Sequence, residues 1–341
     1  MTAPAGRLSE AALPAHASGA AVLRVALARG VAALQADRAA ALAGDVEAVH
    51  RMRIALRRMR AALRAFRPLL RGEPIDRARP SAWESRAGPA RPARHVPVAD
   101  GLAAQDRRLR ALGNTLGPAR DWDVFLEETL VEAAAALPPP LIAALRAAAL
   151  PCRRTAYVAL RQALEDPARL AGLADDLGSW ADGLDRGAVP ACEEPVTTVA
   201  PALLHRMVRQ VRRRARDVEH APAEALHALR KSVKRLRYAT EVLGPYAAPH
   251  AGRAAVAACK TLQDLLGRVN DAAVTPHLAA GLAAAGGSAR RPNDAAAETQ
   301  RHLVEAIAAL AAWAGARGER ARRRLPKALA VLKHASAEQD Q

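Results

Sequence analysis

An arginine-rich segment occurs twice in this 341-residue chain, and the two copies are separated by a constant 177 positions. Residues 49–66 read VHRMRIALRRMRAALRAF, and residues 226–243 read LHALRKSVKRLRYATEVL. Five of the eighteen aligned positions are identical: His50/His227, Arg53/Arg230, Arg58/Arg235, Arg60/Arg237 and Ala62/Ala239. A biased composition easily produces runs of one residue type but not an aligned repeat. We therefore expect the chain to fold into two similar halves.

A second pair of motifs follows the first: LGPARDWDV at residues 116–124 and LGRVNDAAV at residues 266–274. Their separation is 150 positions, so the first half contains 27 additional residues between its two motifs. The stretch 71–99, rich in Pro, Gly and Arg, accounts for these residues and is expected to form an insertion loop. Gly117 and Gly267 are expected to mark either a helix end or a close crossing of helices.

The composition predicts an all-α protein. Alanine, a strong helix former, is abundant, whereas the chain contains only four Trp, three Tyr and two Phe. The expected fold is two similar helical bundles of the four-helix type, related by the internal pseudo-twofold repeat. Breaks at Gly and Pro place helices near 19–43, 45–67, 101–116, 119–136, 140–165, 168–184, 197–218, 222–243, 250–266, 269–285, 295–314 and 318–335. The corresponding domain plan is a flexible tail (1–16), a first half (17–187), a linker (188–195), a second half (196–336) and a short tail (337–341).

Each repeated helix carries an apolar stripe and, one residue further along, a basic stripe. The apolar stripe of the first copy begins at Val49 and recurs at steps of three and four residues, as in a seam that packs against another helix. The basic stripes are His50, Arg53, Arg57, Arg60, Arg64 and Arg67 in the first copy, and His227, Arg230, Lys234 and Arg237, followed by Glu241, in the second. A solvated helix face normally mixes charges of both signs, so an uncompensated basic row beside a packed seam indicates a bound anion.

The net charge favours the same interpretation. The chain has 51 Lys and Arg against 34 Asp and Glu, a formal charge of +17, and only five of the basic residues are lysines. The planar fork of arginine suits bidentate contacts with phosphate. Codon bias in a GC-rich genome explains part of the arginine content but not the net charge, so a polyanionic partner is expected.

Both repeated segments resemble the signature helix of the CHAD domain, the conserved histidine α-helical domain, and the two Leu-Gly motifs resemble its later segments. The matching residues are His50, Arg53, Arg57, Arg58 and Arg60 in the first copy, and His227, Arg230, Lys234, Arg235, Arg237 and Tyr238 in the second. The resemblance spans roughly residues 17–336. It implies two bundles related by a pseudo-twofold axis and a basic central surface that binds inorganic polyphosphate without catalysing a reaction.

The residues expected to bind polyphosphate are His50, Arg53, Arg57, Arg58, Arg60 and Arg64 in the first copy, and His227, Arg230, Lys234, Arg235 and Arg237 in the second. A further row on the neighbouring helix, Arg206, Arg209 and Arg213, is either an extension of this surface or a solvated face. Asp121 and Asp271, which occupy matching positions in the two Leu-Gly motifs, are expected to support the site by orienting arginines through bidentate bonds. The two histidines are expected to donate a hydrogen bond to phosphate or to brace the groove.

Two other functions remain open at this point. A nucleic acid would also bind a basic groove, but single-strand binders add aromatic platforms for bases, and the basic rows contain almost no aromatic residue. An enzyme acting on phosphate or using a metal would depend on His50 and His227, although the residues around them are arginine and lysine rather than metal ligands. We therefore expect no catalytic residue, no cofactor and no metal.

The sequence also bears on location. The longest apolar stretches are interrupted, so none offers the ~20 continuous apolar residues of a membrane span. The first residues lack the pattern of a signal peptide, and the three cysteines have neither disulfide-framework nor zinc-site spacing. We expect a cytoplasmic protein that can associate with polyphosphate granules and has no membrane partner. Monomer and homodimer are both left open.

Overall fold

The computed structural model describes residues 13–73, 75, 97–184, 189–247, 249–286 and 294–337, which form helices joined by turns. The first half contains α1 (Gly19–Leu42), α2 (Val46–Leu70), α3 (Pro97–Val124), the π-helix η2 (Phe125–Thr129), α4 (Leu130–Ala133), α5 (Pro139–Glu165) and α6 (Pro167–Gly183). After α7 (Pro190–Glu193), the second half contains α8 (Val196–Arg214), α9 (Ala223–Ala247), α10 (Pro249–Gly286) and α11 (Asp294–Ala337). The expected all-α fold is confirmed.

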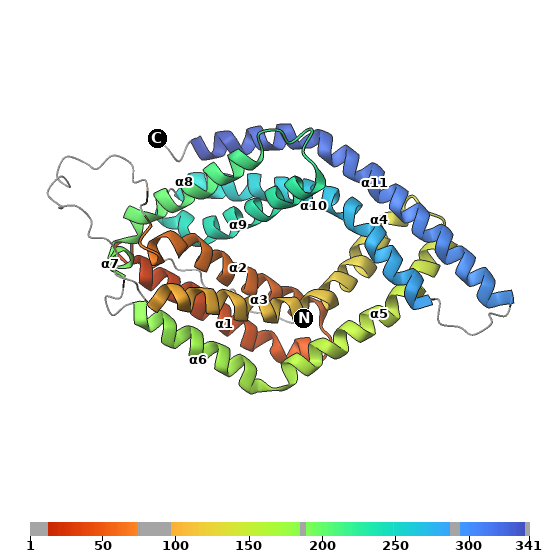
Figure 1. Cartoon of the computed structure of the whole chain (residues 1–341), viewed down its shortest axis with the longest axis horizontal. Helices are drawn as coiled ribbons and strands as arrows, with labels where there is room; N and C mark the ends of the chain where they lie inside the picture. The colour runs from red at the N-terminus through yellow and green to blue at the C-terminus, as the bar shows by residue number, and fades with distance from the viewer. Residues whose placement is uncertain are drawn as a thin grey trace, which may run out of the picture.

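The two halves repeat one plan. By the two sequence offsets, α8 corresponds to α1, α9 to α2, and α10 to the path from α3 to α4. The 44-residue α11 runs along one edge of the molecule, and α5 and α6 together form the opposite edge (Figure 1). The edge in the first half consists of two helices, α5 and α6, rather than one. A new helix begins at Pro167 because Asp166 caps α6, accepting a hydrogen bond from the Ala168 N–H at 2.8 Å, and proline suits the first helical position.

Several expected helix ends are wrong. Gly117 with Pro118, Gly267, and the pair Gly315 and Gly318 all lie inside continuous helices rather than at their ends. A glycine in a helix costs only about 1 kcal/mol relative to alanine, and packing of a long helix outweighs this cost. Gly318 does mark a close crossing, because a Cβ there would lie 2.7 Å from the Ala272 Cβ; a Cβ on Gly267 would have no such neighbour within 4 Å.

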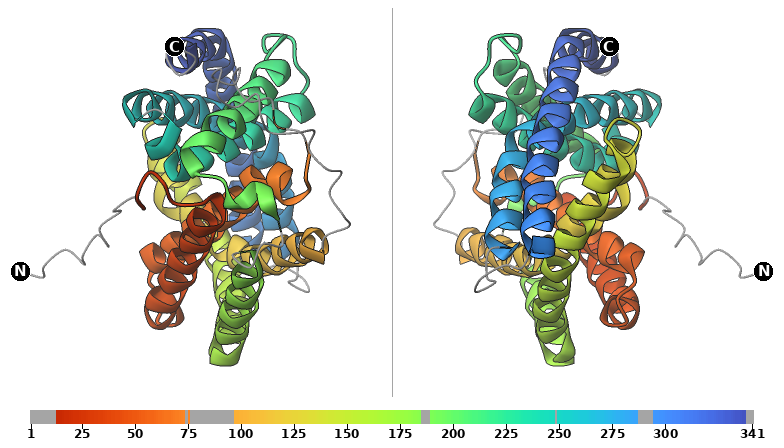
Figure 2. Two further views of the ribbon diagram at one scale, coloured as in Figure 1. Left: turned by 90° about the vertical axis from the view of Figure 1, so that its left-hand side faces the viewer. Right: turned by 90° about the vertical axis from the view of Figure 1, so that its right-hand side faces the viewer.

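The hydrophobic core joins the halves rather than dividing between them. The larger cluster contains buried residues from both, including Met59 on α2 and Leu236 on α9, and α2 packs directly against α9. A second cluster lies around η2, α4 and α5 and includes Phe125 and Leu130 together with Leu282 of α10 and Leu310 of α11 (Figures 1 and 2). Each half thus completes the core of the other, and the positions of α2 and α9 are fixed relative to one another.

Parts of the domain plan fall outside the described residues, including most of the insertion 71–99 and the tail residues 1–12 and 338–341. The last residues of the expected insertion, 97–99, belong to α3. The residues just before α1 are bonded to the second half: the Leu13 N–H donates to the Tyr246 hydroxyl at 2.9 Å, and the Ala17 carbonyl accepts from the Val196 N–H at 2.8 Å. The linker contains α7, in which Cys192 is buried.

One described helix, α1, is long and apolar enough to cross a membrane, contrary to the expectation that no segment meets these criteria. In this fold its apolar residues Leu23, Leu27 and Leu34 are buried, and α1 packs against α2 and α6. Its apolar residues are therefore used in the core.

Candidate anion-binding site

The start of α2 is set by local sequence. Gly44 adopts φ +91° in the turn after α1, a conformation that favours glycine, and Asp45 then accepts a hydrogen bond from the Ala48 N–H at 2.9 Å. Val49, Met52 and Met59 of the apolar stripe are fully buried, as predicted. Burial of this stripe fixes the rotation of the helix and so the direction in which the basic stripe faces.

Four cations from the two repeated helices form a group where α2 meets α9. Arg53 and Arg57 come from α2, and Arg230 and Lys234 come from α9; we call them the central cluster. Each feels the repulsion of at least one other member, and Arg57 and Lys234 are the aligned residues of the two copies. The sequence predicted all four, but only the packing of α2 on α9 brings them together.

Within the described part of the chain, opposing charge at the central cluster is sparse. The Nε atoms of Arg57 and Arg230 are buried without a hydrogen-bond partner, and Lys234 forms no ion pair within 4 Å. Arg53 contacts one carboxylate, that of Asp121, at 3.5 Å. Buried polar groups in folded proteins are normally satisfied, so unsatisfied cations at this point indicate a place for an external anion.

Burial and the neighbouring cations lower the pKa of Lys234. Burial, followed by the charges of Arg230, Arg57 and Arg53, lowers its pKa from 10.5 to about 7, while Asp271 partly opposes the shift. Burial likewise lowers the pKa of Arg53, to which the charges of Arg57 and Arg120 add. A bound anion would restore full protonation of Lys234, because opposite charge favours the charged form.

Anion binding is therefore expected to weaken as the pH rises from about 6 to about 9, because Lys234 loses its charge across this interval. The variant Lys234→Arg keeps its charge and should abolish this part of the pH dependence. Binding titrations of both proteins at constant ionic strength measure the effect. Parallel pH profiles for the two proteins would contradict the assignment.

The same depressed pKa acts on stability with the opposite sign. Between pH about 7 and the ordinary lysine value, the unfolded chain holds more protons than the folded chain, so the free energy of unfolding increases with pH in this window. Below pH about 7 the repulsion is fully present in the folded state. A ligand that neutralises the cluster should therefore stabilise the fold most strongly on the acidic side.

Tyr238 lies beside the central cluster but is only 5% exposed. The guanidinium carbon of Arg237 lies 4.7 Å from its ring centroid, and that of Arg57 lies 5.9 Å away. The ring therefore supports two arginines through cation–π contacts. It is not open for stacking with a nucleic-acid base.

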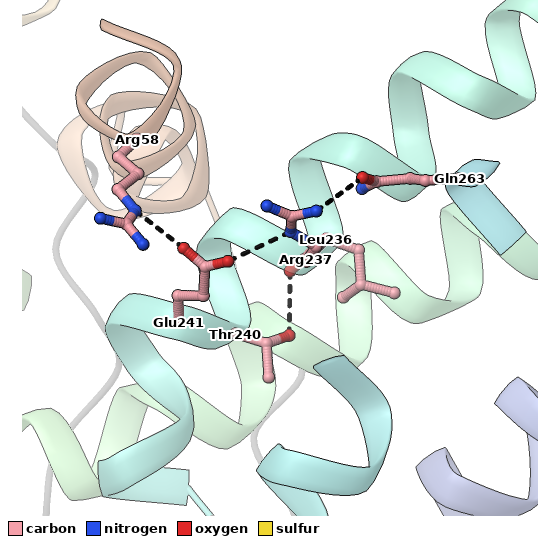
Figure 3. Close-up of polar contacts among 6 residues, drawn as sticks. All are labelled: Arg58, Leu236, Arg237, Thr240, Glu241 and Gln263. Carbon is pink, nitrogen blue, oxygen red and sulfur yellow. Dashed lines mark hydrogen bonds and ion pairs between the residues drawn. The ribbon is translucent and has the colours of Figure 1, made fainter. Parts of the chain in front are cut away.

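Two of the predicted binding arginines are held by a carboxylate within the protein. Glu241 accepts from Arg58 Nε at 2.9 Å and from Arg237 Nε at 3.1 Å, and Arg237 Nη1 also donates to the Gln263 side-chain oxygen at 3.0 Å (Figure 3). This network joins α2 to α9. Arg58 and Arg237 thus act in the interface between the halves as well as contributing positive charge.

Arg60 and Arg64 form a similar network in the first half. Arg60 Nε donates to Asp106 of α3 at 2.8 Å, and Arg64 Nη2 donates to its other oxygen at 3.2 Å. Although burial opposes the change, these two arginines lower the pKa of Asp106. Arg235 approaches the pair from α9, and its pKa is lowered by burial and then by the charges of Arg64, Arg214 and Arg60. One carboxylate here faces several guanidinium groups.

The predicted row of arginines on α8, Arg206, Arg209 and Arg213, lies near Arg64 and Arg235. Arg206 and Arg213 line a cavity of about 680 Å³ together with Arg64 and Arg235, and Arg206 pairs with Glu73 at 2.7 Å. Arg209 is half-buried between them on α8 and is not among the residues that line the cavity. Two of the three residues in the predicted row therefore join the repeated helices at one cavity.

The histidines lie at equivalent positions, the fifth residue of α2 and of α9, but have different neighbours. His227 Nδ1 lies 2.9 Å from the Asn270 side-chain oxygen, within hydrogen-bond distance. Arg120 replaces Asn270 in the first half, and burial followed by the charge of Arg120 lowers the pKa of His50. Burial and the neighbouring cation thus both favour the neutral form of His50.

Among the described residues, Asp121 and Asp271 do not form the bidentate bonds expected of them. The Asp121 side chain is 66% exposed and reaches Arg53 only at 3.5 Å. The Arg53 guanidinium packs instead against α3 one turn earlier, where a Cβ on Gly117 would lie 2.8 Å from Nη1. Gly117 therefore marks a close approach, whereas Asp271 contributes opposite charge near Arg230 without an ion pair.

The sequence did not identify Asp106, Arg120 or Asp123 as important. Asp123 is fully buried and accepts hydrogen bonds from Arg153 Nε and the Tyr157 hydroxyl, each at 2.7 Å, which joins α3 to α5. Arg120 could have been found from its alignment with Asn270 in the Leu-Gly motif. Asp106 and Asp123 are not matched by an identical residue in the second half, so the repeat did not point to them.

Comparison with known proteins places this chain in a family. The model of the CHAD domain matches residues 25–93 and 91–280. The crystal structure of the CHAD domain from the plant Ricinus communis is similar with a TM-score of 0.65 and 25% sequence identity, over 90% of this chain and 92% of that chain. PptA from Streptomyces chartreusis gives a TM-score of 0.61 at 18% identity, over 92% of this chain and 99% of that one, a similarity of fold. A search of curated proteins gives no match.

The fold and the site together define an all-α module built from an internal repeat, with cations concentrated where the two copies meet. The matched residues cover well over half of the sequence. The chain therefore belongs to the CHAD-domain family, and the resemblance inferred from its repeated helices is confirmed.

Proposed function

We propose that this protein is a non-catalytic module that binds inorganic polyphosphate at the central cluster and along the basic stripe of α2. The observation that carries the proposal is the burial of Arg57 Nε and Arg230 Nε without hydrogen-bond partners beside a lysine whose pKa is lowered to about 7. An anion with closely spaced charges would relieve the repulsion among these groups and satisfy their donors. Membership of the CHAD-domain family supports the same ligand.

A nucleic acid is the second candidate, because any phosphate backbone gains from counterion release in a basic groove. Base stacking distinguishes the two ligands. The aromatic ring beside the central cluster, Tyr238, is buried beneath Arg57 and Arg237 and offers no platform for a base. Polyphosphate carries the charge without the bases, so it matches this surface better.

A binding role also suits the histidines better than catalysis. Glu47 and Glu128 contribute opposite charge near His50, and His227 is bonded to an amide, but among the described residues neither histidine is hydrogen-bonded to a carboxylate of the kind that commonly orients a catalytic imidazole. We propose that both groups brace or contact the bound phosphate. The proposed setting is the cytoplasm, including polyphosphate granules.

Long-chain polyphosphate is expected to displace single-stranded DNA of equal charge from the protein at physiological ionic strength. A fluorescent oligonucleotide titrated with each unlabelled competitor measures the order. The affinity for polyphosphate should fall steeply with salt, and removal of one contacting cation should reduce the slope of log K against log salt by about one unit at most. Stronger competition by DNA would favour the nucleic-acid function instead.

A further inference from the structure

Two cavities border the packed pair α2 and α9, and they occupy equivalent places in the two halves. One has a volume of about 680 Å³ and lies among α2, α3, α8 and α9; the other has about 210 Å³ and lies among α1, α2 and α9. At the repeat offset of 177, eight residues lining the first align with eight lining the second, including Arg206 with Arg29 and Arg235 with Arg58. We call them the basic cavity and the apolar cavity.

The two cavities differ strongly in charge. Seven arginines and two carboxylates line the basic cavity, whereas two arginines, one carboxylate and otherwise apolar groups line the apolar cavity. Leu13 and Tyr246, whose backbone N–H and hydroxyl are hydrogen-bonded to each other, help to line the apolar cavity. A polyanion would be attracted to the basic cavity and would find little compensating charge in its counterpart.

The helices α8 and α1 show the same divergence. Arg206 on α8 aligns with Arg29 on α1, but Arg213 aligns with Ala36, so α1 lacks the end of the basic row. In addition, a Cβ on Gly30 would lie 2.5 Å from the Met59 sulfur, so α1 approaches α2 closely. Arg206 and Arg213 of α8 therefore line a cavity together with other arginines, whereas α1 has an arginine at only the first of the two aligned positions.

The decisive difference between the two cavities lies at one aligned position, which is Arg64 in the first copy and Glu241 in the second. Glu241 lies between Arg58 and Arg237 and provides the anion that these two arginines require. The residues aligned with Arg58 and Arg237 are Arg235 and Arg60, and between them the protein places Arg64, another cation. At the end near Glu241, one carboxylate faces two arginines, whereas at the equivalent end the single carboxylate of Asp106 faces Arg60, Arg64 and the nearby Arg235, so positive charge is in excess there.

The basic stripes lead to these two ends. On α2, the stripe continues from Arg53 and Arg57 through Arg60 and Arg64 at steps of three and four residues, so it runs from the central cluster into the basic cavity. On α9, the stripe from Arg230 and Lys234 ends after Arg237 at Glu241. A chain of phosphates that leaves the central cluster therefore meets an excess of cations in one direction, where Asp106 pairs with Arg60 and Arg64 but seven arginines line the cavity, and meets Glu241 at the end of the stripe in the other.

We propose that a linear phosphate polymer leaves the central cluster in one direction only, into the basic cavity lined by Arg64, Arg206, Arg213 and Arg235, and that Glu241 closes the equivalent path. This inference rests on the proposed polyphosphate function and adds a direction to it. The central cluster holds the phosphates common to short and long ligands. The basic cavity holds those that only a longer chain can place there.

The test compares tripolyphosphate with a long-chain polyphosphate, using calorimetric titration of the full chain. In the variant Arg206→Gln/Arg213→Gln, the affinity per chain for the long polymer should fall about tenfold or more, since contacts between charged groups are lost, while that for tripolyphosphate stays nearly unchanged. Arg29→Gln is the matched control, because Arg29 is the aligned counterpart of Arg206; it should change neither affinity. Arg206 and Arg213 are exposed, and Arg213→Gln alone is a milder second variant.

The outcomes separate this inference from the function on which it rests. If the wild-type protein binds neither ligand, the proposed function is wrong. If wild-type binding is observed but Arg29→Gln weakens long-chain binding as much as Arg206→Gln/Arg213→Gln does, the polymer does not leave in one direction. Equal losses for tripolyphosphate and the long polymer in the double variant would also overturn the inference, because the basic cavity would then belong to the primary site.

Discussion

Reversal of both charges at the centre of the site, Arg57→Glu with Lys234→Glu, is expected to weaken the binding of long-chain polyphosphate by about 100-fold or more. Each residue is proposed to make at least one charge-assisted contact, worth about 1.5 kcal/mol or more, so two lost contacts amount to about 3 kcal/mol before new repulsion is counted. Both residues belong to the central cluster, where opposing charge is sparse. Titration at a fixed salt concentration gives the affinity directly.

The appropriate control removes the same charge elsewhere. Lys231 and Lys260 are exposed lysines of the second half outside the central cluster, and Lys231→Glu with Lys260→Glu produces an identical change in net charge. This control should lose far less affinity, because only long-range attraction is reduced. If the two double variants bind equally well, net charge rather than the central cluster determines binding.

The same reversal should not destabilise the free protein. Glutamates at positions 57 and 234 would face Arg53 and Arg230, which repel their present neighbours. Replacing repulsion with attraction keeps the melting temperature at or above that of the wild type. A loss of binding with an unchanged melting temperature would separate the binding role of these residues from any role in folding.

The largest expected effect on stability comes from a different residue, Asp123. Its carboxylate is fully buried and accepts from Arg153 and the Tyr157 hydroxyl, while the Arg153 guanidinium lies 4.5 Å from the Tyr157 ring centroid. The variant Asp123→Ala leaves a buried hydroxyl and a partly buried guanidinium without their acceptor. We expect the free energy of unfolding to fall by about 3 kcal/mol, measured by denaturant titration.

Two milder variants provide reference values for this loss in the free energy of unfolding. Tyr157→Phe removes one hydrogen bond and should cost about 1 kcal/mol, whereas Asp121→Asn removes an exposed charge at 3.5 Å from Arg53 and should cost less than about 1 kcal/mol. Equal losses for Asp121→Asn and Asp123→Ala would contradict the structural role assigned to Asp123. The aligned position in the second half is Ala273, so the carboxylate of Asp123 has no counterpart there.

Helix boundaries were the least predictable part of the fold. Gly117 and Gly267 were expected to mark a helix end or a close crossing, and a helix end was expected near Gly315, yet all three lie within helices. A glycine lowers local helix propensity by an amount that packing along a long helix easily outweighs. The role of Gly117 depends on tertiary packing, because the absence of a side chain there makes room for the Arg53 guanidinium from another helix.

The sequence by itself determined the helical class, the two halves and the membership of the basic stripes. These are local or one-dimensional properties, since helical spacing places residues on one face and an aligned repeat is visible without coordinates. The four residues of the central cluster could be named for this reason. Tyr238 could also be singled out, but not its burial.

Only the tertiary structure decided which cations are paired and which are free. Arg58 reaches a carboxylate 183 positions away in Glu241, and Arg60 reaches one 46 positions away in Asp106, whereas Arg57 Nε, Arg230 Nε and Lys234 lie where no described partner reaches them. Charge compensation acts through space over a few ångströms, so it depends on contacts between distant segments that helical periodicity does not specify. The repeat therefore supplied two equivalent basic stripes, and the packing of α2, α3, α8 and α9 made one of them continuous with a basic cavity.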